Sequence, residues 1–326
     1  MTVTGNCFHH RRLDGRVAEA SGAVVAIGNF DGVHLGHRAV LDMALELARE
    51  ADRPAWVLSF EPHPRTLFNP DAPVFRLTPE AEKARILAAL GFDGLAVLPF
   101  THETAALSAS DFVTLITERM EPAHLVAGFD FHFGRKREGT PEALVSLARG
   151  NGMDATIVAE HADAGGAVSS SRIRRLLGAG NVAAAAESLG HRWAVSGEIV
   201  RGQQLGRTLG YPTANIVPHD IRLEHGIYAV RFRREDSGLH DGVASWGRRP
   251  TFDNGPAWLE TYLFDFSGDL YGEHCTVSFF ERLRGEERFD SAEALTEQMR
   301  RDEAAARDHL AGVKPLTSLD RVLNFR

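Results

Sequence analysis

The chain has 326 residues and a formal net charge of −8. That length allows about two domains, and the negative charge argues against a nucleic-acid binder, which usually carries a basic face. Its two cysteines, Cys7 and Cys275, lie far apart in no metal-ligand spacing, so we expect no disulfide framework. No apolar run approaches the roughly 18 residues of a membrane span, and residues 1–12 show no signal-peptide core. We therefore expect a cytoplasmic protein that binds neither nucleic acid nor a membrane.

A glycine-bearing loop joins the first predicted strand to the first predicted helix. Residues 23–27 are all apolar and favour a buried strand, whereas residues 38–50 show helical periodicity. The segment between them, residues 28–37, reads GNFDGVHLGH and is called the GNF loop below. Such a loop presents backbone N–H groups and a helix N-terminus to a phosphate. His34 and His37 lie about one helical turn apart, so both can face one ligand, although a single histidine is more often structural.

Alternating strands and helices continue to about residue 177. Apolar periodicity predicts helices at residues 79–90, with Thr78 as N-cap, and at residues 108–120, with Ser110 as N-cap. The alternation predicts a doubly wound α/β parallel sheet and leaves the strand order open. Further strands are expected at residues 55–60, 95–98, 124–127 and 155–158, and a further helix at residues 141–149.

Two loops follow strands of this sheet, at the edge where open α/β sheets bind ligands. In the first, EPHPR (residues 61–65), Pro62 and Pro64 stiffen a turn around His63. The second, GFDFHFGR (residues 128–135), interleaves three phenylalanines with polar residues. These rings can line a ligand pocket or simply pack within the loop, and the residues alone favour neither.

A serine-rich segment, VSSSRIRR (residues 168–175), leads into another helix. Serines at a helix start cap it and leave N–H groups available. Arginines in a first turn oppose the helix dipole, and a bound anion would offset that penalty. The alternative is an ordinary capped surface helix.

The second half of the chain changes character near residue 188. Helical periodicity nearly disappears, and short strand-like runs alternate with turn signals until residue 291. This pattern predicts a small antiparallel β-barrel, on which an amphipathic helix at residues 291–310 packs. The expected strands are residues 193–201, 226–233, 242–247, 259–266 and 274–283.

A glycine-rich segment ending in Pro-Thr-Ala-Asn, residues 197–215, is the informative part of this half. It lacks the Gly-Lys-Ser/Thr ending of a Walker loop, and its glycines alone favour a flexible hairpin. Thr213 and Asn215 occupy alternate strand positions, so their oxygens point to one side and can ligate a hard cation. Downstream, alternation puts Glu260, Tyr262 and Phe264 on one face of a strand, where an acidic residue is usually only solvated.

The motifs of the first half resemble those of the nucleotidyltransferase superfamily, and the GNF loop is similar to that of its prokaryotic FAD synthetase branch. The resemblance implies that His34 and His37 stabilise charge on the transferring phosphate without a covalent intermediate. Ser170 and Ser171 would hydrogen-bond phosphates and Arg174 would stabilise developing charge. Gly28, Asn29 and Asp31 would shape the loop and contact the nucleotide.

The same family places flavin beside its Phe-x-Pro-His-Pro and Gly-x-Asp-Phe-x-Phe-Gly segments. By position, the resemblance assigns flavin binding to Phe60, His63, Pro64, Asp130 and Phe131. His132 stands where arginine is frequent, so the sequence does not assign its role.

The motifs of the second half resemble riboflavin kinases. The resemblance implies that Thr213 and Asn215 bind Mg²⁺ and ATP phosphates, and that Glu260 is the base near the accepting hydroxyl. Ser245-Trp246 replaces a frequent Asn-Ile pair, which we interpret as a packing variant. The nucleotide would be covered by Gly202, Gly206, Arg207 and Gly210.

The resemblance covers residues 20–312 and implies a bifunctional riboflavin kinase/FMN adenylyltransferase, with an adenylyltransferase domain at 1–188 and a kinase domain at 189–326. Its partners would be riboflavin, ATP, FMN and FAD, and the oligomeric state stays open. One alternative is a flavin-binding regulator that has lost catalysis, which the retained histidines and Glu260 disfavour. Another is a different nucleotidyltransferase with an unrelated β-domain, which the Pro-Thr-Ala-Asn motif disfavours.

Overall fold

The computed structural model describes residues 2–3, 6–160, 162–163, 166–202, 210–217, 221–236, 238–247 and 257–325. The chain divides into two compact units, Met1–Ser170 and Ser171–Arg326, and each unit is described by itself. No helix among the described residues is long and apolar enough to cross a membrane.

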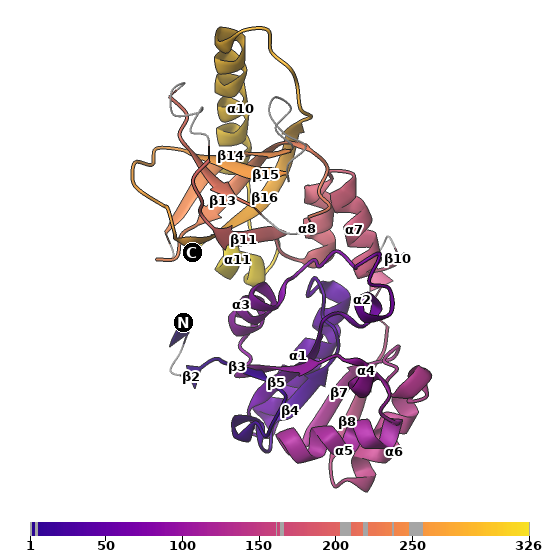
Figure 1. The fold of residues 1–326 in the computed structure, drawn as a ribbon. Coiled ribbons are helices and arrows are strands. Elements are labelled where there is room, and N and C mark those ends of the chain that lie inside the picture. The colour runs from indigo at the N-terminus through magenta and orange to yellow at the C-terminus, as the bar shows by residue number, and fades with distance from the viewer. Residues whose placement is uncertain are drawn as a thin grey trace. The chain divides into compact units, whose positions relative to one another are not determined.

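The first unit is built on a parallel sheet with strand order β3-β6-β5-β4-β7-β8 (Figure 1). From β4 the chain moves outward to β5 and β6, then returns to β7 on the other side of β4. This reversal confirms the predicted doubly wound sheet and creates a topological switch point between β4 and β7. The strands are β3 (His9–Arg12), β4 (Val24–Ile27), β5 (Ala55–Glu61), β6 (Gly94–Pro99), β7 (His124–Gly128) and β8 (Asp154–Val158).

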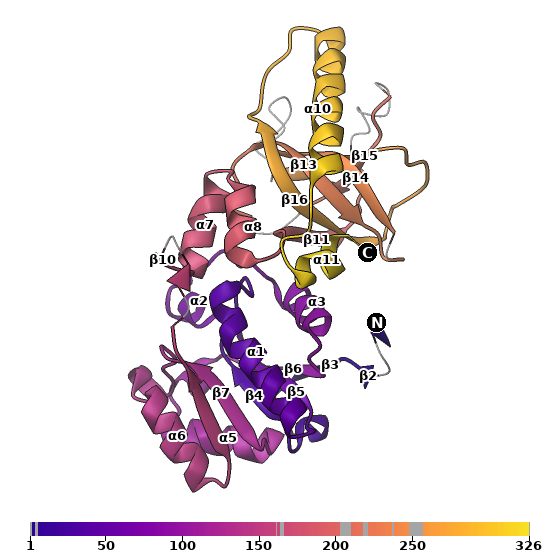
Figure 2. The same ribbon diagram turned by 180° about the vertical axis from the view of Figure 1, so that it is seen from behind.

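Helices cover both faces of this sheet, as its buried, apolar strands require. Helices α5 and α6 share one core with the strands, which includes Val113, Leu144 and Leu58, and α1 lies on the opposite face (Figure 2). The helices are α1 (Leu35–Glu50), α2 (Pro64–Phe68), α3 (Glu80–Leu90), α4 (His102–Ala105), α5 (Ala109–Met120) and α6 (Pro141–Gly150), with 3₁₀ turns η1 (Ala18–Ala20) and η2 (Arg135–Arg137). Two short hairpins pair β1 (Thr2–Val3) with β2 (Asn6–Cys7) and β9 (Ala162–Asp163) with β10 (Gly166–Ala167).

The second unit contains an antiparallel sheet with strand order β11-β16-β13-β14-β15-β12. The sheet curls until its edges approach each other, and an antiparallel bridge pairs Val200, just beyond β11, with Asn215 of β12. The Val200 N–H donates to the Asn215 carbonyl at 2.9 Å. This curled form confirms the predicted antiparallel barrel class. The strands are β11 (Ala194–Glu198), β12 (Thr213–Ile216), β13 (Gly226–Arg233), β14 (Leu239–Gly247), β15 (Trp258–Leu263) and β16 (His274–Arg284).

The predicted C-terminal helix packs against this sheet as α10, contacting β13, β14 and β16 (Figure 1). Ala306 and Leu310 of α10 join a core cluster with Phe264 and Phe280. The helices are α7 (Ser170–Gly178), α8 (Val182–Leu189), α10 (Ala292–Gly312) and α11 (Ser318–Asn324).

Local chemistry differs from the sequence predictions at two helix starts. Ser108, not Ser110, caps α5, because its hydroxyl accepts the Asp111 N–H at 3.1 Å. Thr78 does not cap α3, which begins after Pro79 without a side-chain cap; its hydroxyl instead accepts the N–H of Gly32 at 2.9 Å.

Helices α2, α4 and α11 were not predicted, because elements this short carry too few residues for a periodic signal.

Candidate active sites

The GNF loop leaves the carboxyl end of β4, beside the topological switch point. Ligands of open α/β sheets bind in the crevice at this point. The loops after β5 and β7 leave the same edge, because these strands lie parallel to β4 on either side. The fold therefore brings three sequence-predicted segments, residues 28–37, 61–65 and 128–135, to one edge of the sheet.

The GNF loop has a strained backbone. Phe30 and Val33 adopt φ angles of 46° and 45°, a region that side chains disfavour and that is most unusual for a β-branched residue. Such residues cost on the order of 1–3 kcal/mol each and persist only where the surroundings fix them. Gly32, between them, has φ 98°, which glycine adopts without this cost.

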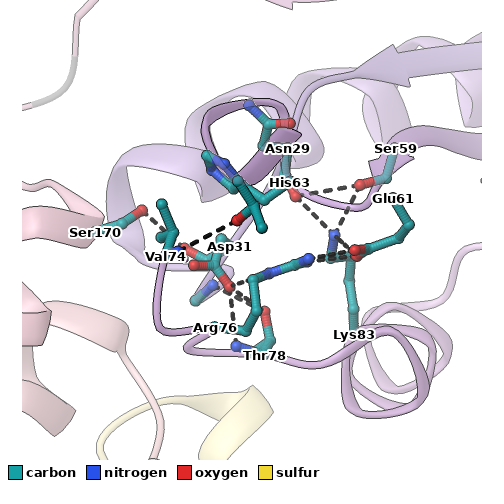
Figure 3. A network of polar contacts seen from close by, with 12 residues as sticks. Asn29, Asp31, Ser59, Glu61, His63, Val74, Arg76, Thr78, Lys83 and Ser170 are labelled. Atoms are coloured by element: carbon teal, nitrogen blue, oxygen red, sulfur yellow. Dashed lines mark hydrogen bonds and ion pairs between the residues drawn. The ribbon is translucent and has the colours of Figure 1, made fainter. Parts of the chain in front are cut away.

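Hydrogen bonds from distant segments hold this strained loop in place (Figure 3). Asp31 is only 1% exposed, and its carboxylate accepts the Thr78 N–H at 3.0 Å. The Ser170 hydroxyl donates to the Asp31 carbonyl at 2.9 Å. With the bond from Gly32 to Thr78, these contacts fix the middle of the loop from both sides. The predicted phosphate residue Ser170 thus touches the loop itself, while Ser171 and Arg174 lie in the first turns of α7.

The two histidines stack on each other at the start of α1. Their ring centroids are 3.6 Å apart with an interplanar angle of 17°, and His34 caps the helix because its Nδ1 accepts the His37 N–H at 3.3 Å. Phe30 meets the His37 ring edge-on at 5.4 Å. Burial, together with the nearby His34 and Lys83 charges, holds the pKa of His37 well below its usual range. Without a ligand, His37 is therefore a neutral imidazole near pH 7.

Two buried polar atoms of this site find no hydrogen-bond partner within the described part of the chain. They are Nδ1 of His37 and the side-chain Oδ1 of Asn29. Leaving a buried polar atom unpaired costs about 1–3 kcal/mol, and such exceptions call for an explanation. A polar ligand seated against the GNF loop would satisfy both atoms.

Beneath the loop lies a set of buried and partly buried polar side chains, called the Lys83 network here: Asp31, Ser59, Glu61, Arg76 and Lys83 (Figure 3). Of these, the sequence analysis had marked only Asp31. Arg76 makes a bidentate ion pair with Glu61, and its Nε lies 3.6 Å from Asp31. Burial and the Arg76 charge lower the pKa of Lys83 to about 8. A sequence signal existed: Lys83 shares the buried face of α3 with Ile86 and Leu87, three and four residues on, where a core residue is expected.

The predicted flavin residues lie around this edge in different environments. Phe60 is 7% exposed and packs in the core against Phe112. His63 caps α2 through a 3.2 Å bond from the Arg65 N–H, and Pro64 begins that helix. Phe131 stacks on Phe133 at 5.5 Å, whereas Asp130 is exposed. His132 is also exposed, with its Nδ1 2.9 Å from the Asp130 carbonyl. Their contact with flavin stays a prediction.

In the second unit, the strand register brings the predicted kinase residues together. Asn215 of β12 lies directly opposite Glu260 of β15, and Thr213 lies opposite Tyr262. On its other side Glu260 pairs with Ser245 of β14. The row Asn215–Glu260–Ser245 thus crosses three adjacent strands, with directly opposed Cβ atoms about 4.5–5.5 Å apart.

Gly202 lies close against this row, because a Cβ at that position would stand 2.9 Å from the Asn215 amide. Gly210 has φ 85°, a conformation that favours glycine. The predicted nucleotide residues Gly206 and Arg207 lie outside the described residues. Trp246 is a core residue whose Nε1 donates to the Leu223 carbonyl at 3.0 Å, which agrees with its interpretation as a packing variant.

The predicted metal ligands of this unit, Thr213 and Asn215, offer neutral oxygens. Among the described residues, no group of three or more His, Cys, Asp or Glu side chains is placed to hold a metal ion. The hydroxyl and amide oxygens of Thr213 and Asn215 are nevertheless oxygen ligands of the kind that Mg²⁺ accepts, and Mg²⁺ usually keeps several waters and substrate oxygens.

A cavity of about 590 Å³ lies elsewhere on the second unit, between β14 and α10. Its two arginines are already paired, Arg231 with Asp241 and Arg307 with Asp265. Among the described residues that line the cavity, neither arginine is left without a carboxylate partner, and none is a sequence-predicted site residue.

Together, the two units define a class: a nucleotide-dependent transferase with a phosphate loop on a doubly wound sheet and a separate β-barrel site. Family models agree, since the FAD synthetase model matches residues 16–172 and the riboflavin kinase model residues 189–310. Bifunctional riboflavin kinase/FMN adenylyltransferases are 39% identical in Escherichia coli K12, covering 91% of this chain and 96% of that protein, and 33% identical in Bacillus subtilis, covering 88% and 92%. The chain belongs to the bifunctional riboflavin kinase/FMN adenylyltransferase family.

A solved structure has the same overall fold over most of the chain. It is the crystal structure of a protein described as a macrolide-efflux protein from Streptococcus pneumoniae, with 34% sequence identity and a TM-score of 0.79. The match covers 88% of this chain and 94% of that one. The architecture of both units is therefore found in an experimental structure.

Proposed function

We propose that this chain phosphorylates riboflavin to FMN with ATP and then adenylylates FMN to FAD, with residues 1–188 as the adenylyltransferase domain and 189–326 as the kinase domain. The observation that carries adenylyl transfer is the stacked His34–His37 pair, with the unpaired Nδ1 of His37, at the switch point of the sheet. Kinase activity rests on the Asn215–Glu260 pairing.

In adenylyl transfer, a phosphate oxygen of FMN attacks the α-phosphorus of ATP, and the bond to the β-phosphate breaks to release pyrophosphate. No group on the protein forms a covalent bond, so positioning and charge stabilisation must supply the rate. His34 and His37 donate to the phosphates at the helix N-terminus, with Ser170, Ser171 and Arg174 as further phosphate ligands. Gly28 and Asp31 shape the loop, and the Asn29 amide contacts the nucleotide.

In the kinase reaction, Glu260 takes the proton of the terminal ribityl hydroxyl of riboflavin as the hydroxyl oxygen attacks the γ-phosphorus, and ADP leaves. Thr213 and Asn215 hold Mg²⁺, which when bound neutralises phosphate charge. The backbone around Gly202, Gly206, Arg207 and Gly210 covers the nucleotide. The flavin of the adenylyltransferase site contacts Phe60, His63, Pro64, Asp130 and Phe131, and both reactions run in the cytoplasm without nucleic acid or membrane.

The direct test is to incubate the full chain with riboflavin, ATP and Mg²⁺ and to separate the flavins by chromatography. FMN should appear first and FAD should follow, with ADP and pyrophosphate as co-products. A protein that forms neither flavin nucleotide would overturn the proposal, and FMN without FAD would overturn its adenylyltransferase half.

A further inference from the structure

We propose that Lys83 is a positioning residue for adenylyl transfer: its buried ammonium fixes the Asn29 carbonyl to the end of β5 and thereby sets the place of His37. This inference rests on the proposed adenylyltransferase activity and adds to it a residue that no sequence motif had marked. Lys83 touches no substrate in this account, because it lies beneath the GNF loop, on α3.

All three donors of the Lys83 ammonium are directed at this junction (Figure 3). Nζ donates to the Asn29 carbonyl at 2.8 Å, to the Ser59 hydroxyl at 2.7 Å and to the Glu61 carboxylate at 3.5 Å. Ser59 in turn donates to the same Asn29 carbonyl at 3.2 Å. Because Ser59 and Glu61 belong to β5 and Asn29 to the GNF loop, Lys83 ties the loop to the neighbouring strand.

The position of Asn29 affects the position of His37 through the residues of the loop. Asn29 is followed at once by the strained Phe30, whose ring rests over Gly28, where a Cβ would stand 2.9 Å from it. That ring contacts His37 edge-on at 5.4 Å. A shift of the Asn29 carbonyl therefore displaces Phe30 and, through it, His37. A misplacement of about 1 Å at a reacting centre can cost roughly 100-fold in rate.

The charge of Lys83 also contributes to the electrostatics of the site, because burial and the charges of His34 and Lys83 together lower the pKa of His37. Arg76, Glu61 and Asp31 face it from the segment before α3, from β5 and from the GNF loop, while its charge acts on His37 of α1. On α3 itself, Glu82 forms a 2.6 Å ion pair with Arg85. Arg76 and Lys83 offset the charges of Glu61 and Asp31, so a protonated Lys83 keeps the net charge of this set at zero beneath a polyanionic ligand. Deprotonation removes one donor and leaves the set negative.

The test compares Lys83→Met and Lys83→Arg in the full chain, with FMN and ATP as substrates. Lys83→Met should lower kcat for FAD formation about 10- to 100-fold, with KM for ATP changed less than about threefold, as expected when positioning is lost. Wild-type kcat/KM should fall as pH rises through about 8, near the pKa of Lys83. Lys83→Arg should recover part of kcat and move this fall to higher pH, because a guanidinium does not titrate there.

Matched controls separate the possible failures. Lys314→Met removes an exposed lysine of the second unit and should leave FAD formation within twofold. Ser59→Ala keeps the Lys83 charge but removes one of its acceptors, so it should lower kcat about threefold without moving the pH at which kcat/KM falls. This variant tests the inference even if Lys83→Met does not fold. The inference is overturned if Lys83→Met keeps the wild-type kcat, or if kcat/KM of Lys83→Arg falls at the same pH as that of the wild type. Failure of the wild-type chain to make FAD would instead overturn the proposed function.

Discussion

The two candidate sites are held in shape by different physical means. In the first unit, a strained loop is fixed by buried hydrogen bonds and ion pairs from residues far away in sequence, such as Thr78 and Lys83. In the second unit, strand register aligns Asn215, Glu260 and Ser245 on three adjacent strands. The first arrangement should be sensitive to substitutions beneath the loop, and the second to substitutions within the row itself.

The difference matters because both sites lie on one chain and both proposed reactions use ATP. If each site depends only on its own supports, each can be damaged without affecting the other reaction. The predictions below examine that independence, starting with the residues that would act on substrate.

Glu260→Ala should reduce FMN formation about 10²- to 10⁴-fold, the usual loss when a general base is removed. FAD formation from supplied FMN should stay within twofold of the wild type. Both rates are measured by chromatography of the flavins. Glu260→Ala forming FMN at the wild-type rate would leave Glu260 as an ordinary solvated strand residue.

His37→Ala should reduce FAD formation about 10²- to 10³-fold, because it removes a donor at the transferring phosphate. Riboflavin should still be phosphorylated, so FMN should accumulate in the same assay. Wild-type FAD production by His37→Ala would show that the stacked pair is structural.

Thr78→Val should destabilise the fold, whereas Thr261→Val should not. The Thr78 hydroxyl accepts the Gly32 N–H and donates to the Asp31 carboxylate, so its removal should lower the free energy of unfolding by about 1–3 kcal/mol and slow FAD formation. The Thr261 hydroxyl is buried without a partner among the described residues, so valine there should be neutral or slightly stabilising. Thermal unfolding with activity measurements compares them; equal destabilisation would contradict the role given to Thr78.

Acid should destabilise the first unit through His37. Because burial lowers the pKa of His37 in the folded chain, the unfolded chain takes up its proton near pH 6.5 while the folded chain does not. The unfolded state then binds more protons than the folded state. The contribution of His37 to the free energy of unfolding is therefore fully present above about pH 6.5 and decreases as the pH falls below it, by at most about 1.4 kcal/mol per pH unit. His37→Gln should flatten that dependence in ligand-free denaturant titrations, and an unchanged slope would exclude His37 as its source.

The sequence predicted what depends on local pattern and recognisable spacing. Apolar runs and turns indicated the parallel sheet and the curled β-sheet, and the spacing of His34 and His37 placed both at one helix start. Strand order could not be predicted, because it depends on long-range pairing, and so the switch point beside the GNF loop appeared only in the structure.

The supports of the loop were missed for the same reason. Thr78 was expected to cap α3, since serine and threonine before a helix usually do so. Its hydroxyl instead accepts the N–H of Gly32, which lies 46 residues away in the strained loop. Lys83 was not singled out, although its place on the apolar face of α3 with Ile86 and Leu87 indicated burial. The functions of the remaining site residues, including His63 and Asp130, rest on position alone.

The most direct test of the two-site account measures both reactions in both variants: FMN from riboflavin and FAD from supplied FMN, for His37→Ala and Glu260→Ala. The account predicts that each variant loses only one reaction, by about 100-fold or more, while the other stays within twofold. Comparable loss of both reactions in either variant would contradict it.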